Sequence, residues 1–217
     1  MASIVDICNI ALSNLGSRAQ ITSISPPDGT VEAGYCARFY PIARKEALDQ
    51  HTWTWSKKRV LLASVANPSD TWLYAYALPS DCLSPLRVIQ QSIARDIFSY
   101  PFGPFYTVDD FNIFTERGSA NFQVEGDVLL TNEPDAVLLY TRDITDTTKF
   151  SASFTTYLAD LLSAYLAGPI VKGENGAKTA ATWRKVAAQV MKDAAVQDAN
   201  GSSERAEHTP DHMRARQ

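Results

Sequence analysis

Few residues of this chain combine the type and the spacing that chemistry requires. Two of its three histidines lie near the C-terminus, in a stretch whose largest apolar residue is Met213. His51 lies in a segment with folding character, where a general base or a ligand is conceivable. A histidine beside Trp53 at a helix end is more often a packed amphipathic residue, and we favour packing. No G-x-S-x-G, G-x-x-x-x-G-K-[ST] or G-x-G-x-x-G motif occurs.

Two carboxylate pairs are the remaining enzymatic option. Asp109 with Asp110, or Glu125 with Asp127, could supply the acid and base of a glycosidase. Both pairs fall in predicted turns, where acidic residues are expected for solvation and turn geometry alone. The run 57–59 (KKR) could contact phosphate, but so short a run is typical of a solvated strand edge. We therefore expect no catalytic residues, no enzyme activity and no cofactor.

Cysteine usage and charge exclude other classes. Cys8, Cys36 and Cys82 are odd in number and far apart, which indicates neither a disulfide framework nor a zinc site. Cys8 and Cys36 fall on predicted apolar helix faces, so we expect buried free thiols and no metal. The formal net charge of −4 lacks the basic footprint of a protein that grips nucleic acid. A slightly acidic chain would instead let DNA slide past it.

The N-terminus shows no cationic region before its apolar stretch, and no apolar run approaches the roughly 18 residues of a membrane span. We expect an intracellular chain without a signal peptide or membrane segment.

Helical periodicity marks both ends of the chain. Residues 4–15 carry one apolar stripe, with Ser3 as N-cap, Asp6 completing a capping box and Gly16 ending the helix. A second helix is predicted from Thr30 towards residue 51, kinked or broken at Pro41. A third begins at Ser151 or Ser153 and should stop or bend at 168–169 (Gly-Pro). A fourth is predicted over 176–199, rich in alanine.

Between these helices the period becomes that of strands. Short β-rich runs alternate with proline and glycine, at 59–65, 72–78, 86–93, 111–114, 121–124, 128–131 and 136–141. The run 122–130 predicts a hairpin around Gly126. The fold class is therefore α+β: a four-helix bundle with an inserted small antiparallel β-sheet domain and an extended C-terminal tail. We expect residues 1–56 and 150–199 to form the bundle, 57–149 the β-rich insert and 200–217 the tail. The predicted bundle core includes Leu12, Leu15, Phe39, Leu158, Leu162 and Trp183.

Two segments are candidates for protein contact. The loop 100–106 (YPFGPFY) is too apolar to suit water, so Tyr100, Phe102, Phe105 and Tyr106 either anchor a partner or fold back on their own sheet. The tail cannot fold alone. It is expected to lie against a neighbouring chain, either a different protein or a sibling copy. Its proposed contact residues are Arg205, Met213, Arg214 and Arg216.

Motifs spread along the chain resemble one known family, the tail tubular protein A or head–tail adaptor (connector) proteins of short-tailed, podovirus-type phages. The most specific pieces are 74–83 (YAYALPSDCL), similar to the family's Y-x-Y-x-L-P-x-D-C-L, and the hairpin around 124–126 (VEG) with 129–134 (LLTNEP). Residues 7–16 (ICNIALSNLG), 38–44 (RFYPIAR), 51–55 (HTWTW) and 140–146 (YTRDITD) follow in the family's order. Thr52 stands where the family often has proline, and residues 92–118 and the tail match nothing.

The resemblance implies a structural protein of the virion, assembled in the host cytoplasm. Identical subunits, typically twelve, would form a ring at the head–tail junction between the portal protein and the tail nozzle protein. Double-stranded DNA would pass through the channel without specific binding. Two alternatives stay open: a peptidoglycan-cleaving hydrolase that uses Asp109 or Glu125, and a monomeric host-directed binding module.

Overall fold

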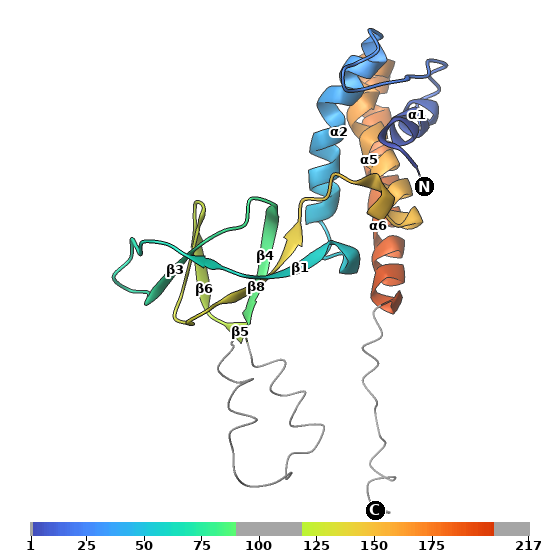
Figure 1. The fold of residues 1–217 in the computed structure, drawn as a ribbon. Helices are drawn as coiled ribbons and strands as arrows, with labels where there is room; N and C mark the ends of the chain where they lie inside the picture. Colours follow the sequence, from blue (N-terminus) through green and yellow to red (C-terminus); the bar gives the residue numbers. More distant parts are fainter. Residues whose placement is uncertain (1, 90–118, 202–217) are drawn as a thin grey trace, which may run out of the picture.

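The protein is described by a computed structural model that covers residues 2–89 and 119–201. Four helices lie together on one side of the molecule, and two small sheets lie on the other (Figure 1). The helices are α1 (Ile4–Asn14), α2 (Val31–Asp49), α5 (Ala152–Val171) and α6 (Gly173–Gly201), with single 3-10 turns η1 (Thr54–Ser56) and η2 (Thr147–Lys149). The strands are β1 (Lys57–Leu61), β2 (Ala63–Ser64), β3 (Tyr74–Ala77), β4 (Cys82–Ile89), β5 (Ser119–Ala120), β6 (Phe122–Glu125), β7 (Val128–Thr131) and β8 (Val137–Arg142). The α+β prediction is confirmed.

The predicted starts of the first three helices are confirmed by their hydrogen bonds, whereas the fourth starts at Gly173 and not at 176. The Ser3 hydroxyl accepts from the Asp6 amide at 3.1 Å, and the Asp6 carboxylate accepts from the Ser3 amide at 2.8 Å. This reciprocal pair satisfies two amides that the first turn would otherwise leave unpaired. Thr30 caps α2 and Ser151 caps α5 through the hydroxyl alone, which accepts from the amides of Ala33 and Phe154. Gly16, with φ +74°, ends α1 as predicted.

Proline interrupts neither long helix. The predicted break at Pro41 is absent, because α2 runs through it as one element, and α5 continues past Pro169 to Val171. Each proline removes one backbone donor, but the residues around Pro41 are held by packing, with Tyr40 and Ala43 buried in the core. The chain turns instead at Lys172 and Gly173, whose φ angles of +60° and +61° place both in the left-handed region.

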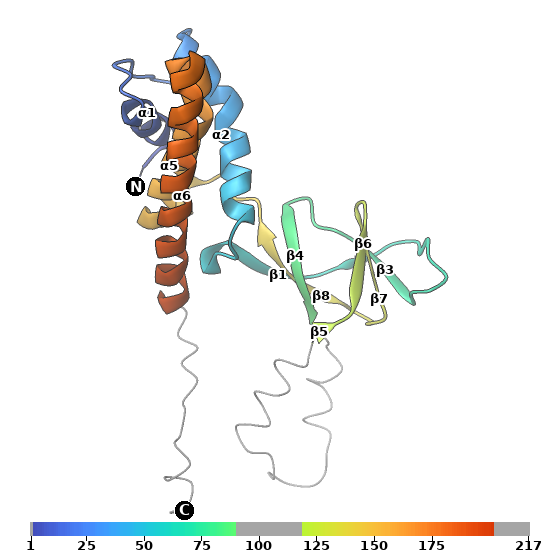
Figure 2. The same cartoon turned by 180° about the vertical axis from the view of Figure 1, so that it is seen from behind.

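The core of the helical part forms around α5, which packs against α1, α2 and α6 (Figures 1 and 2). Leu12, Leu158 and Leu162 are fully buried, as predicted, while Leu15 and Phe39 are half-buried against the same core. Trp183 is a correction: it is only half-buried and does not belong to the core cluster.

Helix α6 buries small residues instead, namely Gly176, Ala187 and Ala194. A Cβ at Gly176 would lie 3.1 Å from the Ala167 carbonyl oxygen, so glycine permits the close approach of α6 to α5.

The apolar character of α5 corrects the expectation that no run is long enough for a membrane. By length and composition alone this 20-residue helix could cross one. Its sides are buried by the other three helices, which is the position of a core helix. The apolar composition of α5 therefore reflects its burial inside the protein.

The β-rich insert holds two four-stranded antiparallel sheets, where a single small sheet was predicted. Their orders are β1-β8-β4-β5 and β2-β3-β7-β6. The predicted hairpin is confirmed, with Phe122 opposite Thr131 and Glu125 opposite Val128. Pro85, predicted to separate strands, lies inside β4 at a shift of register against β8. Such an irregularity tolerates the missing proline donor. The predicted strand 111–114 lies outside the described residues.

A second apolar core lies in the β-rich part. It joins residues of both sheets: Leu62, Tyr76, Val88, Ala120, Leu129, Ala136, Leu138 and Tyr140. The four helices and the two sheets therefore have separate cores. Residues 200 and 201, which the sequence assigned to the tail, belong to α6.

The position of Leu158 yields a stability prediction. Leu158→Ala removes a fully buried side chain and should lower the free energy of unfolding by about 2–5 kcal/mol. Val196→Ala, on a side chain that is 61% exposed, should change it by less than about 0.5 kcal/mol. Urea denaturation of both variants measures the difference. Equal losses would contradict the assignment of helix faces.

Candidate functional site

The residues proposed for protein contact, Tyr100, Phe102, Phe105, Tyr106, Arg205, Met213, Arg214 and Arg216, all lie outside the described residues, as do Asp109 and Asp110. Glu125 and Asp127 are described. They flank Gly126, whose φ is +58°, in the turn between β6 and β7, and both are exposed. An open hairpin turn is the setting expected of turn chemistry, not of a concave catalytic site.

His51 packs against an aromatic cluster, as favoured from its neighbours. Its ring meets Trp53 edge-on at 4.8 Å between centroids, and its Nε2 lies 3.6 Å from an Asp198 carboxylate oxygen. The same carboxylate accepts hydrogen bonds from the Thr54 amide at 2.8 Å and the Thr54 hydroxyl at 2.7 Å. The Thr54 hydroxyl donates to Asp198 and not to His51, so the group lacks the bond between nucleophile and base that defines a catalytic triad. We interpret it as a structural contact.

This contact joins α6 to the segment that follows α2. Trp53 beside it is fully buried, donates from Nε1 to the Ala47 carbonyl, and contacts Phe154 at 5.1 Å. Sequence reasoning missed Asp198, because nothing local relates it to a threonine 144 positions earlier.

A partly buried ion pair attaches the sheets to the helices. Arg44 of α2, whose side chain is 7% exposed, lies 2.7 Å from Asp143, just after β8. The same guanidinium donates to the Ile144 carbonyl oxygen. Lys45 reaches the other oxygen of Asp143 at 3.9 Å, and its side chain is 59% exposed. Arg44 therefore carries the buried part of the connection.

The connection continues into the first sheet. The Asp143 amide donates to the Asp81 carbonyl at 2.8 Å, and the Asp81 carboxylate accepts from Lys58 at 2.9 Å and from the Tyr140 hydroxyl at 2.6 Å. Burial acts to raise the pKa of Asp81, but the hydrogen bonds from Lys58 and Tyr140 outweigh it and hold that pKa below its ordinary value. We name Arg44, Asp143, Asp81, Lys58 and Tyr140 the junction.

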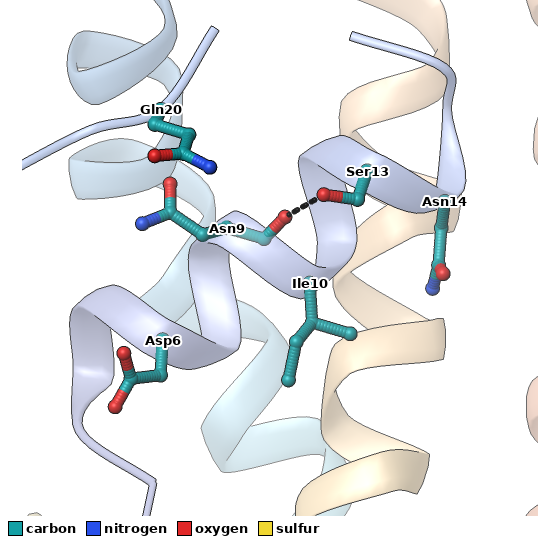
Figure 3. A pocket seen from close by; sticks show the side chains of 6 residues that line it. All are labelled: Asp6, Asn9, Ile10, Ser13, Asn14 and Gln20. Carbon is teal, nitrogen blue, oxygen red and sulfur yellow. Dashed lines mark hydrogen bonds between the residues drawn. The ribbon is translucent and has the colours of Figure 1, made fainter. Parts of the chain in front are cut away.

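A shallow hollow of about 440 Å³ lies beside α1 and is lined by Asp6, Asn9, Ile10, Ser13, Asn14 and Gln20 (Figure 3). Its polar groups are mostly engaged elsewhere. The Asn9 side-chain amide exchanges two hydrogen bonds with the Ile21 backbone, and the Asn9 backbone carbonyl accepts from the Ser13 hydroxyl. Asp6 caps α1. The side chains spread along the helix and do not converge on one point, so we assign no ligand to this hollow.

The cysteines and the other possible metal ligands of the described residues form no metal site. Cys8 and Cys36 are buried and free, as predicted. The hydrogen bond between them, together with burial, raises the pKa of Cys8 and keeps its thiol protonated. Within 2–89 and 119–201, no three His, Cys, Asp or Glu side chains are grouped to hold a metal ion.

Comparison with known proteins leaves the family open. Neither a scan against protein-family models nor a search of curated proteins found a match to this chain. The features that the structure itself offers for function are therefore the junction and the exposed charged surfaces.

The junction yields a test with a matched control. Arg44→Met removes the 2.7 Å ion pair with Asp143 and the hydrogen bond to the Ile144 carbonyl, and it should lower the free energy of unfolding by about 2–3 kcal/mol. Lys45→Met, one position along and exposed, should cost less than about 1 kcal/mol. Urea denaturation followed by tryptophan fluorescence measures both. A loss of similar size in the two variants would show that burial of Arg44 does not stabilise the junction.

A buried carboxyl in the helical core yields a pH prediction. Asp160 is 7% exposed and accepts a 3.2 Å hydrogen bond from Asn14. Burial raises its pKa, partly offset by that hydrogen bond, so the folded state holds the proton more tightly than the unfolded chain. Asp160→Asn should raise the melting temperature at pH 7. The gain should vanish as the pH falls through the raised pKa towards 3.8, where both states are protonated. A gain that is constant with pH would contradict this account.

Proposed function

We propose that the chain is a structural head-to-tail adaptor of a short-tailed phage, a ring subunit that joins the portal to the tail nozzle and surrounds the exit channel for DNA. One observation carries the proposal. Four of the five junction residues lie in segments that resemble this family in sequence, and Arg44 belongs to 38–44. Asp81 belongs to the stretch 74–83, and Tyr140 and Asp143 belong to 140–146.

Two of the motif segments contact each other in the structure. Residues 74–83 run from β3 through a turn into β4, and the Tyr76 hydroxyl donates to the Glu133 carbonyl at 2.9 Å inside the second motif region, 129–134. Residues 140–146 end β8 and lead to α5. Motifs far apart in the chain therefore contact one another. This is expected if they preserve an architecture and not a catalytic centre.

The shape also suits a ring subunit. We infer that the helices form a four-helix bundle around α5, from which the β-rich insert projects (Figure 2). Exposed apolar side chains occur on both parts: Leu73, at 71% exposure, precedes β3, and Val196, at 61%, lies on α6. A subunit that touches different neighbours on its two sides uses such separate surfaces in heterologous contacts.

The test is reconstitution on a portal. Purified chain mixed with the portal of its own phage should add a closed ring to the portal in electron micrographs, and the nozzle protein should then bind below it. A chain that binds neither protein and stays monomeric would favour the host-directed binding module. Clearing of a peptidoglycan gel, lost in Glu125→Ala, would establish the hydrolase instead.

The C-terminal segment gives a second test. We propose that residues 202–217 contact the portal through Arg205, Met213, Arg214 and Arg216. Deletion of 202–217 should leave the melting temperature almost unchanged, because the cores described above lie within 2–201. It should abolish capture of the chain by immobilised portal. Retained capture would refute the role of the tail and leave the adaptor function standing.

A further inference from the structure

The charges of the sheet that lies farthest from the helices are of one sign. We call this the distal sheet: β2, β3, β7 and β6 with their connections, residues 62–80 and 120–136 (Figure 1). These two stretches contain no lysine or arginine. Their acidic residues are Asp70, Glu125, Asp127, Glu133 and Asp135. Glu125 and Asp127 project from the exposed turn at the end of the edge strand β6, beside Val124, which is 37% exposed.

Helix α6 carries the opposite charge on its outer side. Lys178, Lys185 and Lys192 are spaced by seven residues, so they form one stripe along the helix. At 100° per residue this stripe lies opposite Ala187 and Ala194, the residues that α6 buries against the core. All three lysines are exposed, and Val196 continues their stripe. We call this surface the lysine stripe.

Two of the three lysines have no charged partner among residues 2–89 and 119–201. Lys178 pairs with Glu174 at 2.7 Å, which neutralises the first turn. For Lys185 and Lys192 the described part of the chain supplies no ion pair or hydrogen bond. The neighbouring Arg184 differs, because it lies 3.5 Å from Glu46 and over the Tyr165 ring at 5.0 Å. Lys185 and Lys192 are therefore available to an acidic surface from outside.

We propose that the distal sheet of one copy docks on the lysine stripe of the next, with Glu125 and Asp127 against Lys185 and Lys192 and with Val124 beside Val196. The proposal rests on the adaptor function and specifies its ring contact. The first sheet lies between α6 and the distal sheet in both views, so one molecule cannot close this contact on itself (Figures 1 and 2). Two different, complementary surfaces on one chain make a head-to-tail contact, which forms a ring when the rotation between neighbouring copies closes.

A second copy suits the stripe better than a nucleic acid does. Two unpaired lysines per chain neutralise few phosphates, whereas tight duplex binding requires many such contacts. The distal sheet, by contrast, offers carboxylates of this same chain together with exposed apolar side chains. Complementary charge of this kind sets register and partner choice more than it adds affinity.

Zero-length cross-linking tests the contact directly. Equal amounts of chain labelled with ¹⁴N and ¹⁵N are assembled on the portal and treated with a carbodiimide, which joins lysine to carboxylate. Mass spectrometry should find mixed-label peptides that link Lys185 or Lys192 to Glu125 or Asp127. Rings without such mixed links would overturn the contact and leave the adaptor function intact. Absence of any ring would be a failure of the adaptor function itself.

Charge reversal supplies the matched variants. K185E/K192E and E125K/D127K should each reduce ring formation by about tenfold or more, since each sets like charges against each other. An equimolar mixture of the two variants restores opposite charges at every contact and should form rings again. Unchanged melting temperatures keep folding out of the comparison. Rings from either variant alone at the wild-type level, or no recovery in the mixture, would overturn the proposal.

Duplex DNA serves as the competing occupant. Fluorescence anisotropy with a labelled 30-base-pair duplex at low salt should show the same weak signal for wild type and K185E/K192E. Binding that is lost in K185E/K192E and kept in E125K/D127K would assign the stripe to DNA and overturn the contact between copies.

Discussion

The fold depends on the need to cover α5 on nearly every side. Helix α5 buries residues along its whole length, from Phe154 to Ala167, and it cannot do so against one neighbour. Helices α1, α2 and α6 therefore pack around it, although the β-rich segment separates the first two from the last two in sequence. This constraint makes the β-rich segment an insertion that leaves and re-enters the helical part at one place. The junction lies at that place, where Arg44 meets Asp143.

Features that depend on adjacent residues were predictable from sequence. The cap at Ser3, the turn at Gly16 and the hairpin around Gly126 each follow from a few neighbouring side chains, and each is confirmed. Features that depend on distant packing were not. Pro41 and Pro169 predict breaks from local geometry, yet the surrounding core holds both helices continuous. Trp183 fits the apolar face of α6 by periodicity, but small residues make the close contacts and leave the tryptophan at the rim.

The same contrast between local features and distant contacts holds for the candidate sites. Sequence composition identifies loops and tails rich in aromatic or basic residues, but it does not pair groups that lie far apart in the chain. The partnership of Asp198 with Thr54 and that of Asn14 with Asp160 join residues separated by more than a hundred positions. The lysine stripe was equally hard to see, because its meaning depends on which side of α6 is buried. The motif segments did contain four of the five residues whose contacts make the junction, namely Arg44, Asp81, Tyr140 and Asp143.

The hydrogen bonds between Asp198 and Thr54 also offer a mechanical load on this chain a direct route from α6 to the first sheet. A pull on the C-terminal end of α6 reaches η1 and β1 through these two hydrogen bonds, without first crossing the apolar core. The other route runs along α6 and into α5, where small side chains pack closely. A load on the end of α6 would therefore be divided between its packing against α5 and its attachment to the turn that leads into the first sheet.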